Sequence, residues 1–461
     1  MNTFKKKPTI VFFSRDYQAE LFPMLKSDCY DSLHVTMLKS EKKKVESTGA
    51  IVVGCFEEAL ESEASLNDTK FANYLKTSFC SDRFYGKFNI KERILLLAIE
   101  KKFWSDIFDK YKPLAVVNET VAIEISEVMA IEAESRNIKY LAWQPTLFKD
   151  KCFFFSSTPY DSSLDQRITN ISTDTDSINK ATELFNCEDK TPFYTKNLPH
   201  RLNVVSFCLN IRSYFIYKIK KVFYCYKNKY IKDYITDDSF IKFKLNLYFA
   251  SLFYRYESFS TVKDKFELVF YPLHYEPEAT LFYSSEFNDI QPALIRNLCK
   301  CLKQNQVLVV KEHPQQPGML LSKTYRKLKK DLSNLFYLPA EYPTNRIIFE
   351  SKLVVTLVGT AGWQALMQGK PVAVLGKVFY DSYQFINKVD NFDKLRQLIR
   401  SEKYVYPQKE ATIDFIAKMY KFSKKGNPYP HADLYSKANI QQIISVISEE
   451  IQCSQSNTNQ I

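Results

Sequence analysis

The segment 270–278, FYPLHYEPE, places three side chains that can exchange protons directly after a predicted β-strand. The apolar run ends near Pro272, and His274, Glu276 and Glu278 follow it. Because proline keeps the preceding residue out of helical geometry, the two prolines favour an extended loop. Histidine and glutamate are common general acids and bases. The segment therefore indicates a site for proton transfer.

A second segment, 307–314 or VLVVKEHP, has a similar arrangement. An apolar strand leads into Lys311, Glu312 and His313, and Pro314 stops it. The chain has five histidines, and two of them follow predicted strands in equivalent positions. A lysine and a histidine at a strand end can attract an anion such as a phosphate. Each of these residues, taken alone, could equally be a capping or solvent-facing side chain.

A third segment, 355–363 or VTLVGTAGW, is typical of a strand, a turn of small residues and a helix that begins near Gly362. Backbone amides in the first turn of a helix have no partner within it, and the helix dipole makes that end positive. The amides of Thr360 to Trp363 could therefore hold a phosphate or a carboxylate. The alternative is that Gly359 and Gly362 only allow close packing of the strand against the helix.

The composition supports a large folded protein with an anionic partner. The chain has 461 residues, of which 45% are hydrophobic and 25% charged, enough for two or three domains. Global disorder and a small disulfide-stapled module are excluded. Lysine and arginine number 64 against 52 aspartate and glutamate, so the net charge is +12, which suits a nucleotide, an acidic sugar, a phospholipid or a nucleic acid. The ten cysteines show no metal-ligand spacing, and we expect reduced thiols.

No uncharged apolar run is long enough for a membrane-spanning helix, which needs about 18 residues or more. The basic start of the chain is followed only by the short apolar run Ile10–Phe13, which indicates a first strand and not a signal peptide. We therefore expect a cytoplasmic protein, and peripheral attachment to the inner face of the membrane stays open.

The elements that must position the three segments alternate between short apolar runs and helical stretches, which predicts βαβ units and parallel sheets. In the first 150 residues the expected elements are strands at Thr9–Phe13, Ala50–Val53, Leu114–Val117 and Tyr140–Trp143 and a helix at Ile123–Arg136. The second set of expected strands is Phe266–Tyr271, Gln306–Lys311, Leu335–Leu338, Leu353–Leu357 and Val372–Leu375. The helices expected among them lie near Gln291–Lys303, Thr344–Phe349 and Gly362–Gln368.

Between these halves the alternation is lost. Residues 156–177 are rich in Ser, Thr and Asp and indicate a loop, whereas 203–256 is long, aromatic, basic and helical in pattern. We therefore predict an α/β protein of two Rossmann-like domains, 1–150 and 266–461, joined by a largely helical insertion, 151–265. Ligands of open α/β sheets bind outside the carboxyl ends of the strands, so we expect the three segments to face a cleft between the domains. No G-x-G-x-x-G motif supports a dinucleotide dehydrogenase.

Several motifs of the second half resemble bacterial capsular or surface polysaccharide biosynthesis glycosyltransferases. They are FYPLHYEPEA (270–279), Asp289 and Gln291 at the head of the next helix, VLVVKEHP (307–314) and VTLVGTAGWQALMQGKPVAVLG (355–376). The resemblance implies a two-domain GT-B-like fold, in which the N-terminal domain is the acceptor side and the C-terminal domain binds the nucleotide sugar.

The resemblance also implies a donor class and a set of binding residues. Related capsule enzymes use CMP-activated acidic sugars, Kdo or sialic acid, so we expect a CMP-linked donor and a glycan or lipid-linked acceptor. The residues expected to bind the donor are His274, Gln291, Lys311, Glu312, Pro314, Gly359, Thr360, Ala361, Gly362 and Gln364. One of them departs from the family, because Gln364 stands where a glutamate often binds the nucleotide ribose. Glutamine keeps an acceptor oxygen and loses the charge.

Glycosyl transfer from a sugar nucleotide requires stabilisation of the leaving phosphate. We expect His313 and Lys311, with the amides of Gly359 to Gly362, to neutralise it. No Asp-x-Asp pair lies near these turns. We therefore expect neither a metal nor another cofactor.

Inversion also requires a base near the acceptor hydroxyl. Glu276 is the first candidate, and Glu278 and Asp289 are the reserves. In a retaining enzyme a carboxylate could instead be the nucleophile.

The segment 212–232 combines six lysines with seven tyrosines and phenylalanines. A basic, aromatic helix can lie on an anionic lipid surface, and the alternative is a solvated helix with its aromatic side chains packed inward. No RRM, KH or zinc pattern indicates a nucleic-acid partner.

Two other functions fit the same pattern. One is a CDP-polyol phosphotransferase of similar fold, which would need the same phosphate-holding turns. The other is a non-catalytic capsule assembly or export factor, which the glutamine at position 364 makes more credible.

Overall fold

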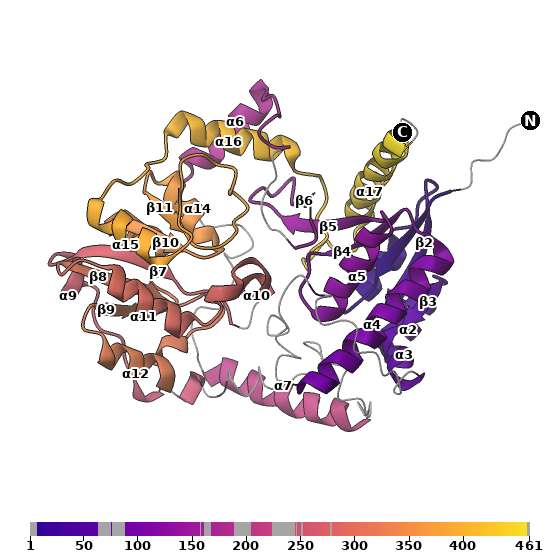
Figure 1. Cartoon of the computed structure of the whole chain (residues 1–461), viewed down its shortest axis with the longest axis horizontal. Coiled ribbons are helices and arrows are strands. Elements are labelled where there is room, and N and C mark those ends of the chain that lie inside the picture. The colour runs from indigo at the N-terminus through magenta and orange to yellow at the C-terminus, as the bar shows by residue number, and fades with distance from the viewer. Residues whose placement is uncertain are drawn as a thin grey trace, which may run out of the picture. The chain divides into compact units, whose positions relative to one another are not determined.

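The computed structural model describes the following residues: 7–62, 75, 88–156, 158–160, 167–188, 204–223, 245, 247–249, 252–276 and 279–458. The chain divides into two units, and each contains one six-stranded sheet (Figure 1). The first unit comprises Met1–Asp161, Tyr226–Thr236 and Phe422–Ile461, and the second comprises Ser162–Cys225 and Asp237–Lys421.

The sheet of the first unit has the strand order β3-β2-β1-β4-β5-β6, and only β6 pairs antiparallel to its neighbour. The strands are β1 (Thr9–Phe13), β2 (Asp31–Thr36), β3 (Val52–Cys55), β4 (Ala115–Glu119), β5 (Lys139–Pro145) and β6 (Phe153–Phe155). The helices of this unit are α1 (Gln18–Leu21), η1 (Phe22–Met24), α2 (Lys39–Glu46), α3 (Phe56–Ser62), α4 (Ile90–Tyr111), α5 (Glu124–Ser135) and α17 (Lys437–Thr458).

Successive side chains of a strand point to opposite faces of its sheet, so apolar strands have two faces to bury. Helices cover both faces of this sheet. On β1, Val11 and Phe13 join a core with α4 and α5, whereas Ile10 and Phe12 join a core on the opposite face. The apolar side of α17 closes that second core, and Ile443 and Ile447 within it are fully buried. Figure 1 shows α17 and α5 beside the strands of this sheet.

The sheet of the second unit has the order β12-β11-β10-β7-β8-β9, and all its pairs are parallel. The strands are β7 (Glu267–Pro272), β8 (Gln306–Lys311), β9 (Leu335–Leu338), β10 (Ser351–Thr356), β11 (Val372–Val374) and β12 (Asn387–Lys388). The helices that precede β7 are α6 (Thr175–Asn186), α7 (Val204–Phe223) and α9 (Ser260–Lys263). Those that follow it are α10 (Ala279–Ser284), η3 (Glu286–Asn288), α11 (Gln291–Cys301), η4 (Met319–Leu321), α12 (Lys323–Asp331), α13 (Thr344–Glu350), α14 (Thr360–Met367), α15 (Phe392–Ser401) and α16 (Lys409–Phe422).

The predicted α/β class with two Rossmann-like sheets is confirmed. Strands β1, β8 and β9 have the expected bounds, but β2, β6 and β12 were not expected. Strand β2, with the sequence DSLHVT, mixes polar residues into a strand, and β12 has only two residues, so neither carries a clear apolar run.

The division of the chain differs from the expected boundaries in two places. The predicted insertion 151–265 is not a separate unit, because most of it groups with the second sheet and residues 151–161 group with the first. The second difference is at the C-terminal end. The prediction assigned 266–461 to one domain, whereas residues 422–461 group with the first unit. The reason is that the buried side of α17 packs on the first sheet and not on the second. A sequence pattern shows that a helix has an apolar side but not which sheet will cover it.

The helical part of the expected insertion is represented by α7, which covers residues 204–223. Several of its large apolar side chains are exposed, namely Val205, Leu209, Phe215, Ile216 and Ile219. The remainder of the basic segment 212–232 lies outside the described residues. Within the described ranges, no helix combines the length and apolarity required to span a membrane.

Candidate functional site

The centre of the second sheet is a topological switch point. The chain runs from β7 outward through β8 to β9, and then returns to the other side of β7 as β10. The loops that follow β7 and β10 therefore diverge, and the crevice outside their carboxyl ends is where open α/β sheets bind ligands. All three segments predicted to carry chemistry follow strands β7, β8 and β10, which are neighbours in this sheet.

Helix α14 begins at this crevice with an open amino-terminal turn. Its N-cap is Gly359, whose backbone is extended and whose amide donates to the hydroxyl of Thr356 at 3.2 Å. No described side chain caps the helix, so the amides of Thr360, Ala361 and Gly362 are left for another acceptor. The helix starts two residues earlier than expected, and the positive end of its dipole therefore lies at Gly359.

His274, from the loop after β7, packs directly against this turn. A β-carbon placed on Gly359 would lie 2.9 Å from Cε1 of His274 and 3.2 Å from Oγ1 of Thr356. The imidazole is buried, and its Nε2 has no hydrogen-bond partner among the described residues. Burial, with the neighbouring His313, lowers the pKa of His274 to about 3, so the ring is neutral at physiological pH.

Two glutamines hold the loop that carries Glu276. The Gln291 side chain accepts from the amide of His274 at 2.7 Å and donates to the His274 carbonyl at 3.0 Å and to the Glu276 carboxylate at 2.6 Å. The amide of Glu276 donates to Oε1 of Gln316 at 2.8 Å, and Nε2 of Gln316 donates to the carbonyl of Glu276. The bonds to the backbone therefore hold the loop in place, and the bond from Gln291 orients the Glu276 carboxylate.

The environment of Glu276 suits a general base. Burial raises its pKa to about 7, although the hydrogen bond from Gln291 lowers it, and nearby Asp289 adds to the rise. A carboxylate that titrates near neutral pH combines sufficient basicity with a deprotonated fraction at pH 7. Asp289 follows η3, and Glu278 lies outside the described residues.

Lys311 and Glu312 are both buried at the end of β8. The ammonium group of Lys311 donates to the backbone carbonyl of Glu312 at 3.2 Å, and burial lowers the pKa of Lys311 to about 8. The Glu312 carboxylate accepts from the backbone amides of Gly318, Leu320 and Ala340. Both side chains, which were expected to contact the donor, therefore bond to the protein in this structure.

His313 is half-buried beside the ring of Tyr275, with ring centroids 5.7 Å apart, and Pro314 after it is half-buried. Its Nδ1 lies 3.2 Å from the amide of Gln315, which donates to it. In the neutral ring the proton is therefore on Nε2, which can donate to a ligand. Burial, together with Lys311, lowers the pKa of His313 to about 4. His313 is thus a neutral hydrogen-bond donor here, whereas a charged partner for the phosphate was expected.

The buried side of α14 adds one further polar atom. Gln364 is 6% exposed, and its Oε1 has no hydrogen-bond partner among the described residues. Gly362, two residues earlier, is buried where an added β-carbon would collide with the hydroxyl of Tyr380 and lie 2.8 Å from Cγ2 of Thr356. Gly362 therefore serves close packing of helix and strand, whereas Gly359 makes room for His274.

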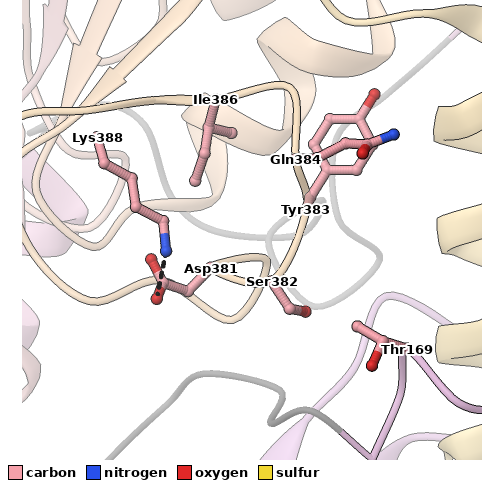
Figure 2. Close-up of a pocket in the computed structure, with 7 residues that line it drawn as sticks. All are labelled: Thr169, Asp381, Ser382, Tyr383, Gln384, Ile386 and Lys388. Carbon is pink, nitrogen blue, oxygen red and sulfur yellow. Dashed lines mark hydrogen bonds and ion pairs between the residues drawn. The ribbon is translucent and has the colours of Figure 1, made fainter.

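An open pocket of about 480 Å³ lies in the same unit. Figure 2 shows its lining residues, which are Thr169, Asp381, Ser382, Tyr383, Gln384, Ile386 and Lys388. Lys388 and Asp381 form an ion pair of 3.0 Å, so the two charged residues of the lining neutralise each other. No residue predicted from the sequence lines this pocket.

Sequence reasoning missed four residues that shape the site, Tyr256, Gln316, Thr356 and Tyr380. A signal existed only for Gln316, because the HPQQP run brackets two glutamines between prolines directly after a predicted site loop. Tyr256 stands in an otherwise exposed stretch, and nothing local distinguishes it. Among the described residues, no cluster of three or more His, Cys, Asp or Glu side chains is arranged to hold a metal ion.

A parallel sheet with an open helix amino terminus at its switch point is typical of proteins that bind nucleotides and other phosphate esters. Residues 207–385 match the family described as capsule polysaccharide biosynthesis protein. This range contains all three predicted segments, and the resemblance inferred from them is confirmed over it.

Among curated proteins, the chain is similar to the capsule polysaccharide export protein KpsS of Escherichia coli, with 31% identity over 106 residues. That match covers 21% of this chain and 26% of KpsS, so the chain spans about a quarter of the relative's length.

The chain is also similar to solved structures, and two of these are from Thermosulfurimonas dismutans KpsC. The β-Kdo 2,4-transferase has 13% identity and a TM-score of 0.37, and the alignment covers 73% of this chain and 87% of that one. The β-Kdo 2,7-transferase has 13% identity and a TM-score of 0.34, with 79% and 97% covered.

Proposed function

We propose that this chain is a glycosyltransferase of capsular polysaccharide synthesis, which transfers a sugar from a nucleotide-linked donor to a glycan or glycolipid acceptor. One observation carries the proposal: the open amino terminus of α14 meets His274 at the switch point, beside the loop that holds Glu276. This arrangement combines a site for an anionic leaving group with a base of suitable pKa. The family match over 207–385 supports the same class of reaction.

In this proposal the amides of Thr360, Ala361 and Gly362 bind the donor phosphate, and the Nε2–H group of His313 donates a hydrogen bond to it without transferring its proton. Hydrogen bonds aimed at the developing negative charge of the leaving group stabilise the transition state without a reorganisation cost. We include no metal in this step. Glu276 accepts the proton of the acceptor hydroxyl, and Gln291 orients its carboxylate.

The donor is proposed to be CMP-linked and to carry an acidic sugar such as Kdo or sialic acid. The net charge of +12 favours such an anionic substrate. The orphaned Oε1 of Gln364 is the proposed acceptor for a ribose hydroxyl, because an unpaired buried carbonyl oxygen gains most from a new donor.

A second candidate is a non-catalytic export factor, and the name of the matching Escherichia coli protein favours it. The two candidates differ in turnover. A glycosyltransferase releases CMP from CMP-Kdo or CMP-sialic acid when an acceptor is added, whereas an export factor releases none. Consumption of a CDP-polyol instead would indicate the phosphotransferase alternative.

The test uses the full chain and the variant His313→Ala. Loss of the Nε2 donor should reduce transfer at least ~10²-fold, which is the scale for one group that stabilises a transition state. The matched control is His431→Ala, because His431 is an exposed histidine whose ring contacts only the local backbone in the described contacts. A folded His313→Ala protein with wild-type turnover would remove His313 from the mechanism.

A further inference from the structure

The carboxylate of Glu312 is fully occupied by hydrogen bonds. Oε2 accepts from the amides of Gly318 at 2.9 Å and Ala340 at 3.2 Å, and Oε1 accepts from the amide of Leu320 at 2.9 Å and from the hydroxyl of Tyr256. The side chain is only 2% exposed. A buried carboxylate with four donors is a structural anchor, since it has no favourable site left for a substrate hydroxyl.

These bonds close the loop that carries His313. The carboxylate of residue 312 binds the amides of residues 318 and 320, so the five residues 313–317 form a loop tied at both ends. Gly318 can present its amide there because its φ is +88°, a conformation that favours glycine. Within the loop, His313 accepts from the Gln315 amide at Nδ1 and from the Gln316 amide at its carbonyl, so the imidazole follows the loop backbone.

Tyr256 supplies the only side-chain donor among these four bonds. It lies in the segment that enters the second sheet, where Leu252–Arg255 and Glu257–Ser258 are exposed but Tyr256 packs against the core of this unit. The phenol joins a residue outside the sheet to a carboxylate at the end of β8. A hydrogen bond to a buried charged group is among the stronger ones in proteins.

We propose that Tyr256 is a positioning residue, which acts through Glu312 to hold the His313 ring in the orientation that receives the donor phosphate. The catalytic part of this inference rests on the proposed function. The geometric part does not, because the ring orientation can be measured without turnover.

The experiment compares Tyr256→Phe with Tyr342→Phe. The control removes a phenol hydroxyl from a half-buried tyrosine of the same unit, one for which no hydroxyl hydrogen bond to a described residue is found. The five histidines allow ¹⁵N-histidine spectra to be assigned by single substitutions. Hydrogen exchange of the peptide 312–320 then reports on the loop, and steady-state kinetics with CMP-Kdo reports on turnover.

In Tyr256→Phe we expect the ring signals of His313 to shift and exchange of 312–320 to accelerate about tenfold, the scale for one lost hydrogen bond to a charged acceptor. The signals of His431 should not move. Turnover should fall about tenfold while KM for the donor changes by less than about twofold, because misalignment lowers kcat more than ground-state binding. Tyr342→Phe should change none of these. Glu312→Gln, which puts an amide group opposite backbone N–H donors, should have a larger effect in the same direction.

Unchanged His313 signals and exchange in Tyr256→Phe would overturn the inference, and so would shifted signals with wild-type kcat. An inactive wild-type protein would instead refute the proposed function. In that case the histidine spectra and the exchange rates still decide whether Tyr256 positions the ring.

Discussion

Among the individual residues of the site, burial decides which groups carry charge. His274 is buried and His313 half-buried, and the loss of hydration lowers the pKa of both rings, so both are neutral. The same effect makes Glu276 a weaker acid than an exposed glutamate. The site therefore offers neutral donors and amides to an anion, and one carboxylate that titrates near neutral pH. The ammonium group of Lys311, two residues before His313, donates instead to the backbone carbonyl of Glu312.

The raised pKa of Glu276 predicts the pH dependence of transfer. A general base must be deprotonated, so the rate should fall as the pH drops below about 7, the pKa of this group, and should level off above it. Glu276→Gln keeps an acceptor oxygen for Gln291 but cannot take a proton. Its rate should be lower by about 10²–10⁴-fold and independent of pH across this range. An acidic limb that persists in this variant would assign the titration to Glu312, whose pKa is also raised by burial to about 7.

At the scale of elements, the two glycines at the start of α14 pack against different side chains. Gly359 faces the His274 ring, and Gly362 faces Tyr380 inside the unit. Both positions exclude a side chain, but for different reasons, and this difference can be tested.

Gly359→Ala should weaken CMP binding more than it lowers the melting temperature. The added methyl group can be accommodated only if the His274 ring or Thr356 moves, and both lie at the anion site. Gly362→Ala should do the opposite, because the collision is with the buried Tyr380 side chain. Calorimetric binding and thermal unfolding of the two variants provide the comparison. Equal effects of both variants on affinity would show that Gly359 has only a packing role.

Helix α7 provides a second prediction at this scale. Exposed apolar side chains and neighbouring lysines suit an anionic lipid surface, where each basic residue contributes about 1 kcal/mol. Replacing Lys218, Lys220, Lys221 and Lys227 with glutamine should remove ~4 kcal/mol of attraction at most and reduce co-sedimentation with phosphatidylserine vesicles. Transfer to a soluble acceptor should not change.

Lys218, Lys220 and Lys221 belong to α7, whereas Lys227 follows it and lies outside the described residues. The control for these four lysines removes the same charge from the second unit at a different place, with Lys323, Lys327, Lys330 and Lys352 replaced by glutamine. These four lysines are exposed. Added salt should weaken wild-type sedimentation, since charges are screened over ~10 Å at 0.1 M. If both quadruple variants lose binding equally, net charge and not α7 is responsible.

At the scale of the whole molecule, the last described helix, α17, and the first described strand, β1, share one hydrophobic core. Helix α17 buries Ile443, Ile447 and Ile451 against the first sheet, and Lys139 pairs with Glu450 at 3.0 Å. The first unit therefore needs residues from both ends of the sequence to complete its core.

Ile447→Ala should lower the free energy of unfolding of the first unit by about 2–5 kcal/mol, the range for removing a fully buried isoleucine side chain. Gln441→Ala, on the exposed side of the same helix, should change it by less than about 0.5 kcal/mol. Urea unfolding monitored by tryptophan fluorescence measures both variants. Equal stabilities would mean that α17 does not contribute to the core of this unit.

The sequence by itself determined the α/β class, most strands of the second unit and the three loops that carry polar residues. These features are local. The apolar run of β8 and the proline that ends it lie next to Lys311 and His313, and the small residues before α14 mark where that helix begins.

Only the tertiary structure decided how those loops combine. The strand order β10-β7-β8 brings His274 against Gly359, 85 positions further along the chain, and no local pattern contains that pairing. It also decided that Glu312 is bonded to the protein, because its partners Tyr256 and Ala340 come from distant segments. The same reason holds for α17, since an apolar helix face is compatible with either sheet until the chain has folded.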